Sequence, residues 1–224
     1  ELSPVTQLTW PYLINLDQVI VTEVNTGTVT QADNMAVVGT GTDTASQAII
    51  QSKKFLPFRA GQGVMARFSA VFTAGIADAT SRQWVGVGDA DDGFLFGFDA
   101  ADFAITYRTT GADVVIDQAD WNIDVMDGSG SAANPSAMTL DPTKGNLYQV
   151  SYGSGFGAVN FSIESDLTGD MVLVHVLEYG NSFIVPSTYN ASHPLCAEAH
   201  NGGSTTDIVL KVAEMAGFIE GLNR

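Results

Sequence analysis

Residues Met65 to Thr73 read Met-Ala-Arg-Phe-Ser-Ala-Val-Phe-Thr, and this stretch decides the fold class. Two sets of residues alternate along it: Ala66, Phe68, Ala70 and Phe72, and between them Arg67, Ser69, Val71 and Thr73. Successive side chains of a β-strand point to opposite faces of the sheet. An alternation of period two therefore predicts a strand that packs one of its faces against a core.

Short apolar runs of the same kind recur on both sides of this strand, separated by Gly, Asp, Asn and Ser at roughly 8–12-residue spacing, as in sandwiches and barrels. Phe94 to Phe98 is apolar at every position except Gly97, which predicts a central strand covered on both faces. Asn25-Thr26-Gly27 predicts a hairpin turn between the first two runs. Further strands are expected at residues 19–24, 27–31, 48–52, 84–87, 103–108, 113–116, 147–152, 158–164, 171–179 and 208–213.

Helix signals are scarce in this sequence. The tail from Lys211 to Leu222 has apolar residues at helical spacing, but Gly217 and Gly221 weaken a helix, and a final strand is equally consistent. We therefore expect an all-β protein with little or no helix, built as one antiparallel β-sandwich over residues 1–224. The number of strands favours a jelly roll or a larger lectin-like sandwich. Residues 1–54 are expected to include an N-terminal docking arm.

The charge balance excludes some classes of partner. The 224 residues include 9 Lys+Arg and 25 Asp+Glu, which gives a formal net charge of −16. A nucleic-acid groove needs a basic stripe to replace phosphate counterions, so we expect no nucleic-acid partner. No run of about 18 apolar residues is present, so we expect no membrane insertion. Cys196 is the only cysteine, which rules out an intrachain disulfide and fits assembly in a reducing cytoplasm.

Gly86 to Phe98 reads Gly-Val-Gly-Asp-Ala-Asp-Asp-Gly-Phe-Leu-Phe-Gly-Phe, and this segment resembles a module of structural proteins of bacteriophages and large DNA viruses. That module has the pattern G-x-G-D-x-x-D-G-F-x-F-G-[YF]. Its opening of basic and aromatic residues before Pro-Gly-x-Gly is similar to residues 53–63, although Ala60 stands where the module has Pro. Further similar elements follow in the same order, at residues 141–148, 155–159, 174–181 and 201–206.

The resemblance implies a concanavalin-like or jelly-roll sandwich on a virion, without a catalytic set of residues. It implies a virion structural protein, used in capsid decoration, a fibre or a tail, for particle assembly or host attachment. The expected partners are further copies of the chain and other virion proteins, and the expected place of assembly is the host cytoplasm. The alternative is a carbohydrate-binding, lectin-like receptor domain that binds a host surface glycan.

The most acidic local cluster is formed by Asp89, Asp91 and Asp92, followed by Gly93. Carboxylates that alternate on a tight Gly turn could bind Ca²⁺, which is the only cofactor that the sequence suggests. The EF-hand pattern fails, because no Glu follows at the required distance. Asp side chains that accept hydrogen bonds from their own backbone would build the same turn, and we favour that interpretation.

A glycan hydrolase is a less favoured alternative. It needs two carboxylates across a cleft, and Glu164 and Glu178 are the candidates on adjacent predicted strands. Three histidines match no zinc pattern. Of these, His175 shares strand parity with Leu173 and Leu177, which predicts a core or interface histidine, and His193 is expected in a loop with Cys196 and Glu198.

Two features are candidates for contact with a ligand or partner. Trp121 lies between Asp120 and Asn122, a polar context that predicts an exposed aromatic side chain. The second feature is a basic group that could dock onto an acidic neighbour such as a second copy of the chain, or could be only a solvated strand end. It consists of Lys53, Lys54, Arg59 and Arg67.

Overall fold

The computed structural model describes residues 2–77, 80–153 and 155–220, which form fifteen β-strands and one 3-10 turn, η1 (Gln118–Asp120). The strands pair antiparallel in two sheets, and the described residues include no α-helix. This confirms the all-β sandwich. No helix in the described part of the chain is long and apolar enough to cross a membrane.

The first sheet has eight strands. Its longest strand, β15 (Val209–Glu220), pairs with β4 and β1 on one side and with β6 on the other. In spatial order its strands are β13 (Met171–Leu177), β12 (Val159–Glu164), β11 (Asn146–Tyr152), β6 (Val64–Val71), β15 (Val209–Glu220), β4 (Met35–Gly39) and β3 (Thr28–Ala32), with β1 (Leu2–Thr9) also paired to β15.

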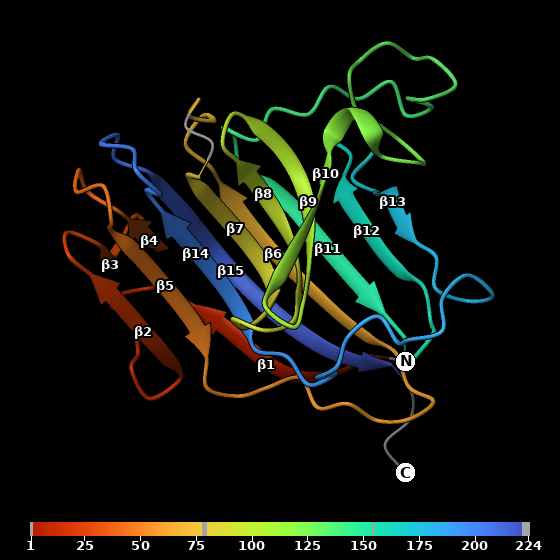
Figure 1. The fold of residues 1–224 in the computed structure, drawn as a ribbon, viewed down its shortest axis with the longest axis horizontal. Coiled ribbons are helices and arrows are strands. Elements are labelled where there is room, and N and C mark those ends of the chain that lie inside the picture. The colour runs from red at the N-terminus through yellow and green to blue at the C-terminus, as the bar shows by residue number, and fades with distance from the viewer. Residues whose placement is uncertain (1, 78–79, 154, 221–224) are drawn as a thin grey trace.

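The second sheet has seven strands and is stacked on the first, as Figure 1 shows. In spatial order its strands are β10 (Ala112–Asp117), β9 (Asp102–Thr109), β8 (Gly93–Asp99), β7 (Arg82–Gly88), β14 (Leu195–His200), β5 (Gln47–Ser52) and β2 (Val19–Val24).

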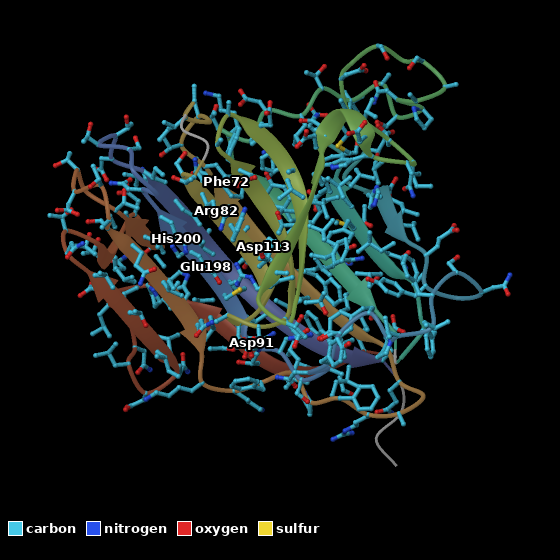
Figure 2. All side chains as sticks on the ribbon, viewed as in Figure 1. Phe72, Arg82, Asp91, Asp113, Glu198 and His200 are labelled. Atoms are coloured by element: carbon cyan, nitrogen blue, oxygen red, sulfur yellow. The ribbon has the colours of Figure 1, made fainter. Side chains whose placement is uncertain are left out.

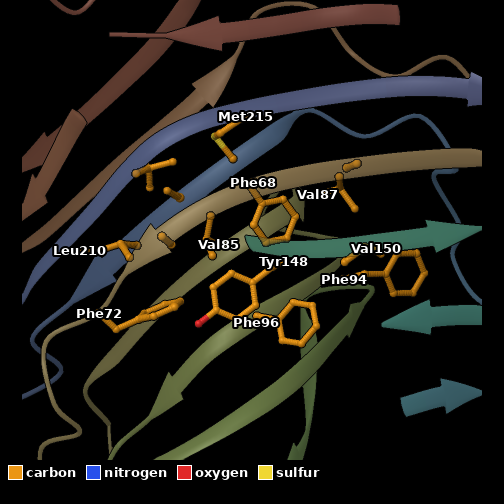
Figure 3. Close-up of a cluster of buried hydrophobic side chains, with 14 of the residues drawn as sticks. Phe68, Phe72, Val85, Val87, Phe94, Phe96, Tyr148, Val150, Leu210 and Met215 are labelled. Atoms are coloured by element: carbon orange, nitrogen blue, oxygen red, sulfur yellow. The ribbon is translucent and has the colours of Figure 1, made fainter. Parts of the chain in front are cut away.

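One hydrophobic core fills the space between the sheets (Figure 3). Phe68 of β6 and Tyr148 of β11 come from the eight-stranded sheet, and Phe96 comes from β8 of the seven-stranded sheet. The ring centroids of Phe96 and Tyr148 lie 5.1 Å apart, and those of Phe68 and Phe96 lie 6.4 Å apart. Aromatic contacts at these distances stabilise beyond the area that they bury. One set of side chains of the seven-stranded sheet fills this core. The alternate set points away from the core, on the outer face of that sheet, and can form a site there.

Two glycines let β7 and β8 approach closely. A Cβ atom at Gly97 would lie 1.8 Å from the carbonyl oxygen of Gln83, and one at Gly86 would lie 2.3 Å from that of Phe94. Gly97 pairs directly with Trp84 in the ladder. The glycines of the Gly86–Phe98 segment are thus required by the contact between these two strands.

Most predicted strands are confirmed. The alternating stretch is β6, where Phe68 is buried and Arg67 is exposed. The segment that is apolar on both faces is β8, which lies between β7 and β9 and is buried from Gly93 to Phe98. The structure also contains β7–β8, β9–β10 and β12–β13 hairpins.

Two expectations differ from the structure. Asn25-Thr26-Gly27 does not close a hairpin, because β2 and β3 belong to different sheets. Residues 2–52 supply β1 to β5 of the two sheets, and a docking role for part of this segment stays a prediction. The segment after His193 is strand β14 and not a loop. The tail, for which helix and strand were both considered, is strand β15. Gly221 and Leu222 of that tail lie outside the described residues.

Candidate functional site

Charged and polar side chains gather on the outer face of the seven-stranded sheet, the face that points away from the core. Val85, Ile105 and Ala197 belong to the core, so their neighbours along the same strands point outward. Figure 2 shows Arg82, Asp113, Glu198 and His200 over the middle of this sheet. Because β7, β10 and β14 each contribute one or more of these residues, the sheet holds them in fixed positions.

Ion pairs connect these side chains into one network. Arg108 has its Nη1 atom 3.3 Å from Glu198 Oε1 and donates from Nε to Asp113 Oδ1 at 2.8 Å. Arg82 lies 3.2 Å from Asp99 and 3.5 Å from Asp113. His200 Nε2 lies 3.3 Å from Glu198 Oε2. Each partner limits the rotamers of the next, so the network presents its polar groups in a fixed arrangement.

Trp84 lies beneath this network. The guanidinium carbons of Arg82 and Arg108 lie 5.0 Å and 5.1 Å from the centre of its ring, which is within the range of cation–π contacts. Trp84 is almost fully buried, as expected from its strand, and packs against Leu95 and Cys196 in a small second cluster. Its indole therefore supports the two arginines and offers no free face to a ligand.

The protonation states of the central pair follow from its contacts. Burial alone would raise the pKa of Glu198, but the hydrogen bond with His200 and the charge of Arg108 hold that pKa below its ordinary value. Burial alone would lower the pKa of Arg108, but Glu198 and Asp113 raise it above its ordinary value. Both side chains are thus charged at neutral pH, and Glu198 acts as an acceptor of hydrogen bonds.

Two polar groups under the network lack partners. The indole N–H of Trp84 and the hydroxyl of Thr106 are buried and make no hydrogen bond. Thr106 points to the same face, because its neighbours Ile105 and Tyr107 pack toward the core. Proteins rarely leave buried polar groups unpaired, so each of these two groups calls for an explanation.

An open hollow of about 640 Å³ lies over this part of the sheet, and we call it the polar hollow. Arg108, Asp113, Glu198 and His200 line it together with Thr22, Gln47, Ile49, Gln51 and residues 89–91 and 111. A smaller recess of about 200 Å³ shares Gln47 and His200 and extends toward Arg82 and Gly202. The two recesses therefore adjoin each other at Gln47 and His200.

Comparison of the sequence with protein-family models gives no match, and comparison with curated protein sequences gives none. Solved structures do match. The basic winged bean lectin with Tn-antigen has a TM-score of 0.55 at 9% identity, covering 96% of this chain and 98% of that one. Arcelin-5, a lectin-like defence protein from Phaseolus vulgaris, has a TM-score of 0.54 at 8% identity, covering 97% and 99%. The chain has a legume-lectin-like β-sandwich fold.

A third similar structure is the binding domain of botulinum neurotoxin serotype D/C. Its TM-score is 0.52 at 11% identity, and the match covers 96% of this chain and 48% of that one. Sequence identities this low establish the fold alone, so the function has to be argued from the residues of the polar hollow.

The aspartates of the Gly88–Gly93 turn are engaged within the protein. Asp89 Oδ1 accepts hydrogen bonds from the backbone N–H groups of Asp91 and Asp92. Asp92 is buried and accepts from the backbone N–H groups of Tyr189 and Asn190, both at 3.2 Å. In the described part of the chain no three His, Cys, Asp or Glu side chains are placed to hold a metal. The turn interpretation accounts for Asp89 and Asp92, and Ca²⁺ binding stays a prediction that this geometry does not favour.

Trp121 is not the exposed aromatic that its polar neighbours predicted. Its side chain is buried against Phe96 and Phe103, and its Nε1 atom donates to the carbonyl oxygen of Ile116 at 3.3 Å. The indole needs only one polar partner, which the backbone supplies, so a polar sequence context does not keep it at the surface.

The basic group is divided between two places. Lys53, Lys54 and Arg59 lie in the connection between β5 and β6, whereas Arg67 lies within β6 and donates from Nε to Gln149 Oε1 at 2.7 Å. Lys53 and Lys54 are exposed. The connection therefore remains a candidate contact surface.

The carboxylates considered for glycoside hydrolysis lie far apart. Glu164 ends β12, whereas Glu178 follows Leu177, which pairs with Val159 at the start of β12. Six residue positions separate them along the strand, which is roughly 20 Å at about 3.3 Å per residue. A retaining or inverting pair must lie within about 5 to 9.5 Å. These two residues therefore cannot act on one glycosidic bond.

Histidine 175 is the buried histidine that strand parity predicted. Its Nδ1 atom accepts a hydrogen bond from the backbone N–H of Asn122 at 3.2 Å, and burial lowers its pKa. The sequence did not single out the polar hollow, because Arg82, Arg108, Glu198 and His200 are spread over about 120 residues. Two residues could have indicated this site, because Arg108 and Glu198 are charged residues within otherwise apolar strands.

Proposed function

We propose that this chain is a carbohydrate-binding domain and that the polar hollow is its glycan site. The observation that carries the proposal is the Arg108–Glu198 pair, which is buried from water on most sides but lines an open hollow. Charged pairs held in this way present fixed donors and acceptors, as recognition of several neighbouring hydroxyl groups requires. Gln47, Gln51 and Thr22 add further donors and acceptors around the pair.

The same fold supports the proposal, since the similar winged bean lectin is described with Tn-antigen. The charges of the hollow narrow the class of glycan. Its lining includes the carboxylates of Asp89, Asp91, Asp113 and Glu198 but only one guanidinium, that of Arg108. Like charges repel a carboxylate or sulfate brought to this surface. We therefore expect a neutral glycan, and the two adjoining recesses favour an oligosaccharide over a single sugar.

A glycan array tests the proposal. The wild-type domain should bind neutral oligosaccharides and should not bind sialylated, uronic-acid or sulfated ones. Glu198→Gln should weaken binding by at least about tenfold, because the neutral amide loses a charge-assisted hydrogen bond. Absence of any binding on a broad array would contradict the proposal.

Two further variants test whether the glycan binds in the polar hollow. Gln47→Ala removes a half-buried polar side chain from the polar hollow without breaking an ion pair, so it tests glycan binding even if Glu198→Gln is unstable. Glu214→Gln makes the same chemical change on an exposed side chain of β15, outside the hollow. We expect weaker binding for Gln47→Ala and unchanged binding for Glu214→Gln.

We also propose that the domain acts on a virus particle, in attachment to host glycans. This second proposal is supported by the ordered motif resemblance centred on Gly86 to Phe98. Mass spectrometry of purified virions should find the chain as a stoichiometric component. Its absence from particles, with abundant free protein in the cell, would contradict the virion setting and leave the glycan site unaffected.

A further inference from the structure

A second groove lies at one end of the sandwich, away from the polar hollow. Its cavity has a volume of about 670 Å³, within the range of sites that enclose a ligand. Phe98, Phe103 and Val125 form its apolar floor. Asp102, Asp117 and Asp127 are exposed at its rim, and none of the described residues that line it is basic. We call it the acidic groove.

The acidic rim lacks compensation by positive charge. Partial burial, followed by the negative charges of Asp102, Asp120 and Asp99, raises the pKa of Asp117. Carboxylates crowded in this way favour a cation that would share them. An occupant that suits both the floor and the rim must carry apolar groups next to positive charges.

The chain itself presents such a segment. Phe55 and Phe58 are 41% and 43% exposed, although they are large apolar residues. Lys53 and Lys54 are exposed directly beside them. We call residues 53–58 the basic-aromatic loop.

This loop is held in place by its backbone. The carbonyl oxygen of Lys54 accepts from Ser52 Oγ at 2.8 Å, and the N–H of Phe58 donates to Ser192 Oγ at 3.0 Å. Leu56, between them, is fully buried and bridges to His193. A loop fixed in this way loses little conformational freedom when it docks.

The acidic groove and the basic-aromatic loop lie at opposite ends of the strands. Arg82 pairs with Asp99 at the groove end of β7 and β8. At the other end, Leu195 pairs with Val87, and its N–H donates to Ser52, the last residue of β5 before the loop. Figure 1 shows the connection after β5 at the bottom of the view, and the β8–β9 connection and the segment after β10 at the top. The loop therefore cannot reach the groove of its own chain.

From this complementarity we propose that the acidic groove binds the basic-aromatic loop of a second copy of this chain. Phe55 and Phe58 enter over the apolar floor, and Lys53 and Lys54 face Asp102 and Asp117. Because the two surfaces differ and lie at opposite ends, the contact is head-to-tail, and it continues into a ring or a filament. It is independent of the glycan site.

Sedimentation velocity over a range of protein concentrations tests this assembly. The wild type should associate progressively as its concentration rises. Lys53→Glu/Lys54→Glu should raise the dissociation constant by at least about tenfold, because like charges then face each other. Asp102→Lys/Asp117→Lys should do the same from the groove side. All four residues are exposed, so both variants should fold.

A mixing experiment distinguishes a head-to-tail contact from a symmetric one. The loop variant keeps an intact groove and the groove variant keeps an intact loop, and the reversed loop of one carries charges opposite to those of the reversed groove of the other. Neither variant should associate alone, and their mixture should associate as the wild type does. Arg67→Glu/Lys211→Glu changes the net charge as the loop variant does, but on β6 and β15, and should associate like the wild type. A monomeric wild type at about 1 mM, variants that associate normally, or a mixture that does not associate would each overturn the proposal.

Discussion

At the residue scale, the protein uses buried ionisable side chains in two ways. Glu198 and Arg108 are charged because each compensates the other. His193 lies fully buried between Phe94 and Tyr152, and its Nδ1 atom has no hydrogen-bond partner. Burial lowers the pKa of His193 to about 4, against the opposite effect of Asp89 and Asp92. This histidine is therefore neutral at physiological pH.

His193 should make stability depend on pH. Between its unfolded pKa of about 6.5 and its folded pKa of about 4, the unfolded chain binds a proton that the folded protein does not. The free energy of unfolding should thus fall as the pH falls through this range, by about 3 kcal/mol from this residue. Urea denaturation at several pH values should show a smaller decrease for His193→Gln. Equal decreases in variant and wild type would show that His193 does not titrate in this way.

Arg108 allows a sharper test at the same scale. It donates to Glu198, to Asp113 and to the carbonyl oxygen of Asp89, and a lysine ammonium cannot make this planar set of contacts. Arg108→Lys keeps the charge, yet it should weaken glycan binding by about tenfold or more. Isothermal titration with a glycan found on the array checks this. If the lysine variant binds as well as the wild type, charge alone and not geometry defines the site.

At the element scale, the strands were predictable because each strand carries its own periodicity. β6 alternates over eight residues, and β8 is apolar on both faces. Strand β14 was missed because it is short and its outward face carries Glu198 and His200, which read as loop residues. The partner of each strand depends on contacts between residues distant in sequence. Local sequence therefore predicted neither that β2 and β3 belong to different sheets nor that the site residues lie together.

The close contact of β7 with β8 gives a prediction at this scale. Gly97→Ala would place a methyl group 1.8 Å from the carbonyl oxygen of Gln83, and the strands would have to separate. The free energy of unfolding should fall by about 3 kcal/mol. Gly169→Ala is the control: its φ is +76°, but no atom lies within 4 Å of the new Cβ, so it should cost only about 1 kcal/mol. Similar losses in urea denaturation would show that the strands adapt to the added methyl group.

At the scale of the whole molecule, strands from both ends of the chain meet in the middle of the sheets. β14 lies between β7 and β5, and β15 lies between β6 on one side and β4 and β1 on the other. The sandwich is therefore one cooperative unit, and the described residues do not divide into independent halves.

Removal of the last strand should consequently abolish the fold. A chain that ends at Gly203 lacks β15, so β6, β4 and β1 lose their common partner. Circular dichroism and heteronuclear NMR should show no cooperative β structure, and a synthetic peptide of residues 204–220 should restore it. Persistence of a folded core in the truncated chain would show that the seven-stranded sheet is stable by itself.

The pairing of Leu2 with Glu220 has a consequence for biosynthesis. On the ribosome, β1 emerges before the other described strands, and its partner β15 emerges after them. At about 5 to 20 residues per second, the nascent β1 waits on the order of ten to forty seconds for β15. During that time the apolar faces of both sheets are exposed to the cell, so the newly made chain should depend on a holdase chaperone until β15 has emerged.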